Sequence, residues 1–122
     1  MTRVVLDIKN SALTTSSDVS GKQLTVRFKG CLDMDSDTAL ENLLGSIKTA
    51  LEDGTLREVI FQAHDLYLMN SSAISRVAAW VKAVKVIRPV CRVRFRTNPN
   101  LAWQRRTLDS IRRVAEQLVT VE

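Results

Sequence analysis

The chain has 122 residues, of which 45% are hydrophobic and 25% charged, so it has the size and composition of one ordinary globular domain. No apolar run approaches the roughly 20 residues that a bilayer-crossing helix needs, and the first residues carry a charge too early for the apolar core of a signal peptide. We therefore expect a cytoplasmic protein without a transmembrane segment.

The net charge is +5, and most of the excess lies in the second half of the chain. It allows binding to nucleic acid, an anionic surface or an acidic protein, but it does not choose among them. No helix-turn-helix, zinc-finger or aromatic-stacking motif accompanies the charge, so nucleic acid is not the expected partner. The basic residues are Lys82, Lys85, Arg88, Arg92, Arg94, Arg96, Arg105, Arg106, Arg112 and Arg113.

The first part of the chain predicts two strands separated by a loop. Residues 3–9 alternate weakly between apolar and polar, which favours a strand, whereas residues 10–21 are rich in Ser, Thr and Asp, which favours a loop. Residues 23–29 alternate cleanly and predict a half-buried strand that ends at Gly30.

A helix follows. Thr38 and Glu41 fit a capping box, in which the two side chains satisfy backbone donors at a helix start, and Asp53-Gly54 ends the helical pattern. The face expected to be buried carries apolar residues at helical spacing: Leu40, Leu43, Leu44, Ile47 and Leu51.

The second half predicts further alternation of strands and helices, with Pro89 closing the linker after the second helix. The predicted elements are a strand at 58–63, a loop at 64–70, a helix at about 71–85, a strand at 91–97, a helix at about 101–118 and a short strand at 119–121.

This order predicts a single α/β domain with a mixed four- to five-stranded sheet covered by about three to four helices. In such sheets functional loops gather beyond the carboxyl ends of the strands. Two predicted loops are in that position, at 30–37 and at 64–70.

Catalytic and metal-binding chemistry finds little support in the sequence. His64 beside Asp65 lacks a nucleophile elbow, a second carboxylate pair or a phosphate-binding loop, so we expect no enzymatic activity. Asp33, Asp35 and Asp37 have the spacing of the first ligands of a calcium loop, but the Gly and the closing Glu of that motif are missing. Asp35, Ser36 or Asp37 is instead expected to help cap the helix that follows, where the helix dipole favours negative charge. No metal and no cofactor are expected, and Cys31 and Cys91 are expected to be free thiols.

The segment Asn70-Ser71-Ser72 stands where a strand and its loop give way to a helix. Such residue types cap helices, and the free amide groups there also favour a phosphate. Ala73, Arg76 and Trp80 follow at spacings of three and four residues, so they share a helix face beside the core stripe. Trp80 is expected either to be a partly exposed docking anchor or to be tucked beneath a neighbouring helix.

Two segments, in this element order, resemble motifs of the STAS domain family, which includes anti-sigma factor antagonists and the C-terminal domains of sulfate transporters. Gly30-Cys31-Leu32-Asp33 followed by Thr38-Ala39 resembles the family's Gly-x-Leu-Asp segment. Leu68-Met69-Asn70-Ser71-Ser72-Ala73-Ile74 resembles its phosphorylatable Asp-Ser-Ser-Gly-Leu loop, with Asn70 in place of Asp and Ala73 in place of Gly. The resemblance implies one STAS-like domain over residues 1–122, with a core at about 23–121.

In that family the unmodified loop binds a serine kinase of the histidine-kinase-like ATPase fold, which often doubles as an anti-sigma factor, and a phosphatase resets the modified protein. The resemblance therefore implies a non-enzymatic regulatory binding protein. Its phosphoacceptor would be Ser71, with Ser72 as the alternative, and Asp33 would be the facing acid. The remaining residues implied in partner binding are Asn70, Ser72, Ala73, Arg76 and Trp80.

Two other functions stay open. A constitutive scaffold, such as the STAS subunits of lipid-transport systems, would use the same helix without phosphorylation. A nucleic-acid or anionic-surface binder would use the arginines of the second half.

Overall fold

The structure is a computed structural model that describes residues 12–122; the strand predicted at 3–9 lies outside the described residues. Five strands form one sheet in the order β1-β2-β3-β4-β5, with β1 antiparallel to β2 and the other pairs parallel. The elements are β1 (Leu13–Ser20), β2 (Gln23–Leu32), the 3₁₀-helix η1 (Met34–Ser36), α1 (Asp37–Glu52), β3 (Glu58–Met69), α2 (Ser71–Val84), β4 (Arg92–Arg96), α3 (Ala102–Arg112) and β5 (Val119–Val121). The predicted single α/β domain with a mixed sheet is confirmed.

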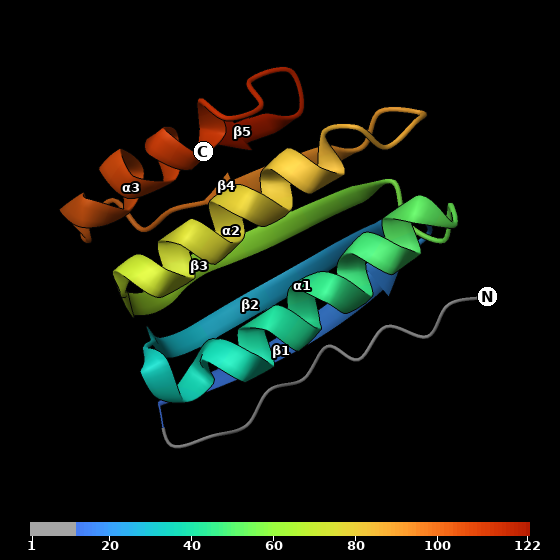
Figure 1. Ribbon diagram of the computed structural model, residues 1–122. Coiled ribbons are helices and arrows are strands. Elements are labelled where there is room, and N and C mark those ends of the chain that lie inside the picture. The colour runs from blue at the N-terminus through green and yellow to red at the C-terminus, as the bar shows by residue number, and fades with distance from the viewer. Residues whose placement is uncertain (1–11) are drawn as a thin grey trace.

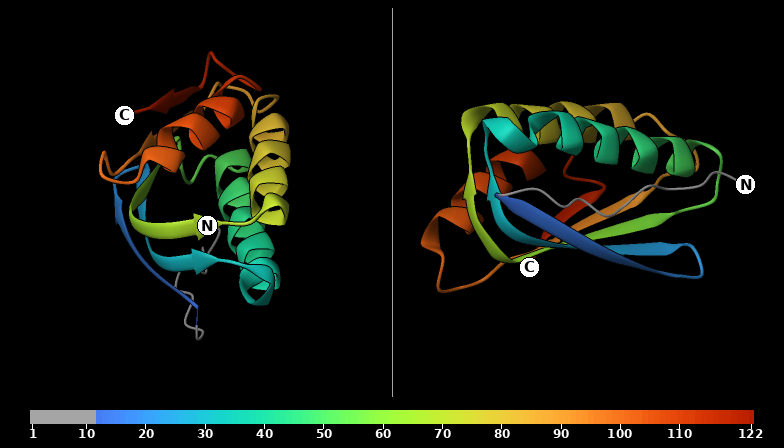
Figure 2. Two further views of the ribbon diagram at one scale, coloured as in Figure 1. Left: turned by 90° about the vertical axis from the view of Figure 1, so that its left-hand side faces the viewer. Right: turned by 90° about the horizontal axis from the view of Figure 1, so that it is seen from below.

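The three α-helices cover one face of the sheet. α1 and α2 lie side by side along the strands, and α3 lies over the β4–β5 side (Figure 1). Figure 2 shows from two directions that the sheet curves around this helical layer. Strand residues that point to the helices are apolar and buried, as alternation along a half-covered strand requires: Leu24, Val26, Phe28, Val59, Phe61, Val93 and Phe95.

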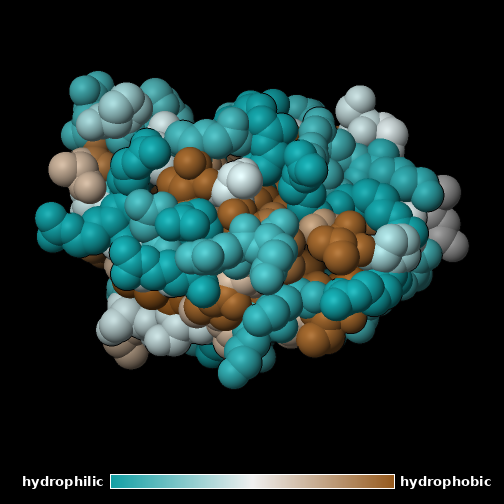
Figure 3. All heavy atoms as spheres, turned by 90° about the horizontal axis from the view of Figure 1, so that it is seen from above, coloured by the Kyte–Doolittle hydropathy of each residue, from teal (hydrophilic) through white to brown (hydrophobic). Residues whose placement is uncertain are grey.

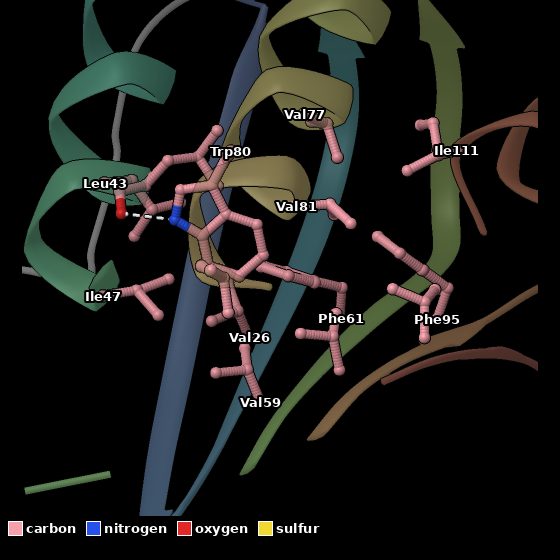
Figure 4. Packing of buried hydrophobic residues seen from close by; sticks show 14 of the residues in the cluster. Val26, Leu43, Ile47, Val59, Phe61, Val77, Trp80, Val81, Phe95 and Ile111 are labelled. Carbon is pink, nitrogen blue, oxygen red and sulfur yellow. Dashed lines mark hydrogen bonds between the residues drawn. The ribbon is translucent and has the colours of Figure 1, made fainter. Parts of the chain in front are cut away.

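The core lies between the sheet and the helices. The apolar face predicted for α1 is buried as expected, and Phe61 stacks on Phe95 and meets Trp80 edge to face. Figure 4 shows Trp80 of α2 lying between α1 and the sheet, with Phe61 and Phe95 further along the same layer. Burial of these aromatic and branched side chains is the main source of stability.

The opposite face of the sheet carries no helix in the described residues, and ion pairs cross its strands. Arg94 on β4 pairs with Glu58 on β3 at 3.8 Å and with Glu122 after β5 at 2.7 Å. Arg27 on β2 pairs with Asp18 on β1 at 2.7 Å. Exposed pairs of this kind contribute little to stability, about 0–1 kcal/mol each, but they keep this face polar.

The loop predicted at 10–21 is wrong, because residues 13–20 form β1. At the start of β1, the buried Leu13 and Thr15 alternate with exposed Thr14 and Ser16. A two-residue turn, in which Gly21 has φ +60°, joins β1 to β2. Polar composition suggested a loop, whereas antiparallel pairing with β2 makes a polar-faced edge strand.

Strands β2 and β3 both extend past their predicted ends. Gly30 does not end β2, since the chain continues to Leu32 through a register shift. The predicted loop at 64–70 is also wrong, because β3 runs to Met69, and only Asn70 separates it from α2. The two extensions pair with each other, so each supplies the hydrogen bonds that the other needs.

The capping box predicted at Thr38 and Glu41 is wrong as well. The described structure has its capping box one turn earlier, where the Asp33 side chain accepts from the Ser36 amide and the Ser36 hydroxyl accepts from the Asp33 amide at 2.9 Å. The short η1 turn feeds directly into α1, so the cap stands at the start of the combined helical segment. The last helix is also shorter than predicted, ending at Arg112 instead of about residue 118.

Gln104 of α3 holds the middle of β3 where that strand has left β4. It is fully buried, and its Nε2 donates to the carbonyls of Ala63 at 2.6 Å and Leu66 at 2.8 Å. Its Oε1 accepts from the Asn98 amide at 2.7 Å. A buried polar side chain with all these bonds fixes the segment of β3 that leads to Asn70.

Candidate functional site

Asn70 joins β3 to α2 and is tied at both of its ends. Its amide donates to the Leu32 carbonyl at the end of β2, at 2.9 Å. Its Oδ1 accepts from the Ala73 amide at 2.8 Å, which makes it the N-cap of α2. The start of α2 is therefore held against the carboxyl edge of the sheet.

Ser71 and Ser72 form the first two residues of α2, and both are exposed. The Ser72 hydroxyl donates to Asp37 Oδ1 at 3.1 Å. Ser71 precedes Ser72 at the N-terminus of α2, where free backbone amides and the helix dipole favour negative charge.

Arg76, one turn into α2, binds the same carboxylate as Ser72. Its Nε and Nη2 donate to the two oxygens of Asp37, each at 2.7 Å, and its Nη1 lies 3.3 Å from Glu41 Oε2. The hydrogen bond from Arg76 lowers the pKa of Asp37 below its ordinary value, and the Ser72 hydroxyl adds to the effect. We call these four residues, Asp37, Glu41, Ser72 and Arg76, the Asp37 bridge; it joins the first two turns of α1 to the first two turns of α2.

Asp33, the facing acid of the resemblance, lies at the end of β2, but its carboxylate is used within its own turn. Oδ1 accepts from the amides of Asp35 at 3.0 Å and Ser36 at 3.3 Å. The acids that contact α2 are Asp37 and Glu41, and only Asp37 also binds Ser72; the sequence suggested no more than a capping role for Asp37.

Two of the residues implied in partner binding are part of the core. Trp80 is 6% exposed, and its indole Nε1 donates to the Leu44 carbonyl of α1 at 2.7 Å (Figure 4). Of the two alternatives, Trp80 is thus tucked beneath the neighbouring helix and is not an exposed anchor. Ala73 is 2% exposed, so its methyl group lies under the surface of the helix start.

Three apolar side chains at this edge were missed from the sequence. Met34 is 83% exposed, Tyr67 55% and Leu68 50%. Leu68 pairs with Cys31, and Leu32 pairs with Met69, so these residues lie where β2 and β3 end beside Asn70. Alternation along the strand gave no signal for them, because Leu68 has the same phase as the buried Leu66 and the opposite phase to the buried Met69.

The two segments that contain the ends of β2 and β3 are acidic, unlike the chain as a whole, and they meet at the serine loop, Asn70-Ser71-Ser72. Segments 29–41 and 64–76, which meet at the loop, hold five carboxylates against Lys29 and Arg76: Asp33, Asp35, Asp37, Glu41 and Asp65. Seen from the side on which α3 and β5 lie, the surface is mostly hydrophilic, with separate hydrophobic patches (Figure 3).

The remaining candidate residues for catalysis, disulfide formation or metal binding lie outside the serine loop. His64 lies in β3 with its side chain exposed, and its backbone carbonyl accepts from Asn98 Nδ2 at 3.0 Å. Cys31 and Cys91 are free, as predicted, and burial raises the pKa of the Cys91 thiol. Among residues 12–122 no cluster of three His, Cys, Asp or Glu side chains could hold a metal, and no helix is long and apolar enough to cross a membrane.

Comparisons with known proteins give a fold but no close relative. No family model and no curated protein matches the sequence. Solved structures do match. An anti-sigma factor antagonist from Mycobacterium paratuberculosis has a TM-score of 0.63 at 15% identity, covering 84% of this chain and 81% of its own.

The Bacillus cell fate determinant SpoIIAA in its phosphorylated form has a TM-score of 0.62 at 19% identity, covering 88% of this chain and 90% of its own. An anti-sigma factor antagonist STAS domain from Rhodobacter sphaeroides has a TM-score of 0.50 at 18% identity, covering 77% and 95%. The chain has the STAS fold.

Proposed function

We propose that this chain is a non-enzymatic regulatory binding protein of the anti-sigma factor antagonist type, switched by phosphorylation of Ser71. The observation that carries the proposal is the placement of an exposed serine at the first residue of α2, directly after the Asn70 cap. The partner would be a serine kinase of the histidine-kinase-like ATPase fold that also acts as an anti-sigma factor, with a phosphatase to reset the switch in the cytoplasm.

The surface around Ser71 supports binding to a protein. Met34, Tyr67 and Leu68 supply exposed apolar area at the edge of the sheet, and the adjoining segments carry carboxylates. A mixed apolar and acidic surface suits a partner with a complementary basic rim. The partner that this edge suits is therefore basic, although the net charge of the whole chain is +5.

Phosphorylation would change this surface without refolding it. The Ser71 hydroxyl would attack the γ-phosphorus of ATP, the new O–P bond would form as ADP leaves, and the hydroxyl proton would pass to a base on the kinase. The product adds roughly 1.5 to 2 negative charges to an already acidic edge. A partner with groups fitted to the neutral hydroxyl would then bind more weakly, or differently.

The similar structures support the proposal at the level of their names. Two are described as anti-sigma factor antagonists, and SpoIIAA is described in a phosphorylated form. The Asn70 cap keeps the side-chain oxygen that an Asp would provide at the same place, because it already accepts from the Ala73 amide.

The test is the phosphorylation state of the protein taken from its own cells. We expect intact mass spectrometry to show a fraction heavier by one phosphate, and peptide fragmentation to place it on Ser71. Ser71→Ala should lose this species, and Ser75→Ala, an exposed serine one turn along α2, should keep it.

A stable co-purifying partner that is retained equally by wild type, Ser71→Ala and Ser71→Asp would contradict the switch. It would favour the constitutive scaffold instead.

A further inference from the structure

The two adjacent hydroxyls at the start of α2 differ in what they contact. Ser72 Oγ donates to Asp37 Oδ1 at 3.1 Å, whereas no side-chain hydrogen bond of Ser71 occurs within the described part of the chain. Consecutive helical residues are turned by about 100° about the axis, so a group that faces α1 from position 72 does not face it from position 71. Of the two serines, only Ser72 belongs to the Asp37 bridge.

The Asp37 bridge leaves no guanidinium nitrogen of Arg76 free for a second anion. Arg76 already uses Nε and Nη2 on the two oxygens of Asp37, and Nη1 lies against Glu41. Ser72 and Arg76 are four residues apart and therefore neighbours on one face of the helix. A phosphate on Ser72 would lie beside the Asp37 carboxylate and compete with it for the same guanidinium.

The cost of that competition is electrostatic. Like charges only a few ångströms apart repel strongly even in a partly wet site, and the bidentate contact between Asp37 and Arg76 is among the stronger kinds of ion pair. To accommodate a phosphate on Ser72, Arg76 must leave Asp37, which breaks the Asp37 bridge between α1 and α2. A phosphate on Ser71 needs no such rearrangement.

We propose that Asp37 determines which serine of the loop tolerates a phosphate: it engages Ser72 and makes a phosphate there incompatible with the Asp37 bridge, which leaves Ser71 as the acceptor. This inference rests on the proposed function for its biological meaning. Its physical content concerns only this chain, and Asp37 acts as a positioning residue.

The experiment installs phosphoserine directly and needs no kinase. Phosphoserine is incorporated at position 71 or 72 during synthesis, in the wild-type chain and in Asp37→Asn, and the folding equilibrium constant is measured by urea unfolding at neutral pH. We expect the constant to be at least ten-fold lower with phosphoserine at 72 than at 71. In Asp37→Asn the two should agree within about three-fold, because the repelling charge is gone.

Glu41→Gln is the matched control. It removes the other carboxylate that contacts Arg76 but does not touch Ser72, so it should leave the difference between the two phosphoproteins in place. The Nε resonance of Arg76 gives a second readout: its ¹H–¹⁵N signal should move with phosphoserine at 72 and stay with phosphoserine at 71.

Equal stability of the two phosphoproteins would overturn the inference, and so would a difference that persists unchanged in Asp37→Asn. If the chain with phosphoserine at 72 does not fold, the inference requires that the same chain fold once Asp37→Asn is added. Since no kinase takes part, a protein that is never phosphorylated in cells would defeat the proposed function and leave this measurement as it stands.

Discussion

At the scale of single residues, Asp37 is the most informative side chain of the molecule. It is a carboxylate in the first turn of α1, a position where the helix dipole alone favours negative charge. The structure gives it a guanidinium and a hydroxyl from another helix, and these contacts could not be derived from spacing within the sequence.

The Asp37 contacts predict a pH-dependent contribution to stability. The folded pKa of Asp37 lies below its ordinary value of 3.8, mainly through Arg76, so the unfolded chain takes up a proton first as the pH falls. The contribution should be fully present above the ordinary value and be lost as the pH falls through the folded pKa. The difference in urea midpoint between wild type and Asp37→Asn should follow this course.

In Arg76→Gln the effect of Asp37→Asn should shrink at every pH, because the main cause of the shift is gone. A wild-type minus Asp37→Asn difference that grew on acidification would contradict this assignment.

The two tryptophans predict opposite outcomes for the same substitution. Trp80→Phe removes a buried donor from the Leu44 carbonyl and leaves space in the core, so we expect a loss of about 1–3 kcal/mol in unfolding free energy. The Trp103 indole nitrogen is buried without a hydrogen-bond partner among the described residues, so Trp103→Phe removes an unsatisfied donor and should change stability by less than about 0.5 kcal/mol or increase it. Chemical denaturation of both variants checks the contrast.

At the scale of elements, the sequence predicted the regular parts of the fold and missed the ends of strands. The leucine face of α1, the start of α2 at Ser71, the basic strand β4 and the short β5 follow from periodicity that burial enforces. The ends of β2 and β3 do not, since polar or aromatic residues there are held by pairing with each other and by Gln104. Long-range partners of this kind leave no local pattern.

The candidate site divides in the same way. Asn70, Ser71 and Ser72 could be found because helix caps have a sequence signature. The burial of Trp80 could not be decided from the sequence, because a tryptophan beside the core stripe can either be exposed to solvent or pack against a neighbouring helix. Asp37 was missed as the contact of α2 because the pairing depends on how α1 and α2 pack.

Gly30 predicts how sensitive the β2 extension is to a single methyl group. Its φ is +111°, and a Cβ there would lie 2.1 Å from the Ala12 carbonyl oxygen. Gly30→Ala should therefore cost at least about 2 kcal/mol in unfolding free energy. Gly45 is the matched control: it lies inside α1 with open space at its Cβ position, so Gly45→Ala should increase stability by about 0.5–1 kcal/mol. Thermal unfolding of both variants should separate them in sign.

At the scale of the whole molecule, the charge is uneven. The chain carries +5, yet the segments that meet at the serine loop are acidic, and on the open sheet face Arg94 is already paired with Glu58 and Glu122. Net charge therefore says little about the partner of the site.

This distribution predicts weak and non-specific binding to nucleic acid. Titration of a labelled DNA duplex should give a dissociation constant weaker than about 10 µM at about 0.15 M salt, with affinity falling steeply as salt rises. Ser71→Asp should bind DNA as the wild type does. Tight binding that survives physiological salt would revive the nucleic-acid alternative.

The order of the strands in the sheet is the order of the strands in the chain. Each described strand therefore finds its partner among the residues that leave the ribosome just before it, and no strand has to wait for a later one to be inserted between two others. Such a chain can grow its sheet from one edge to the other while it is being made, and the helices α1 and α2 can pack as soon as the strands on either side of them exist. Mostly local pairing shortens the loops that must close, which favours fast folding and a short lifetime for exposed strand edges.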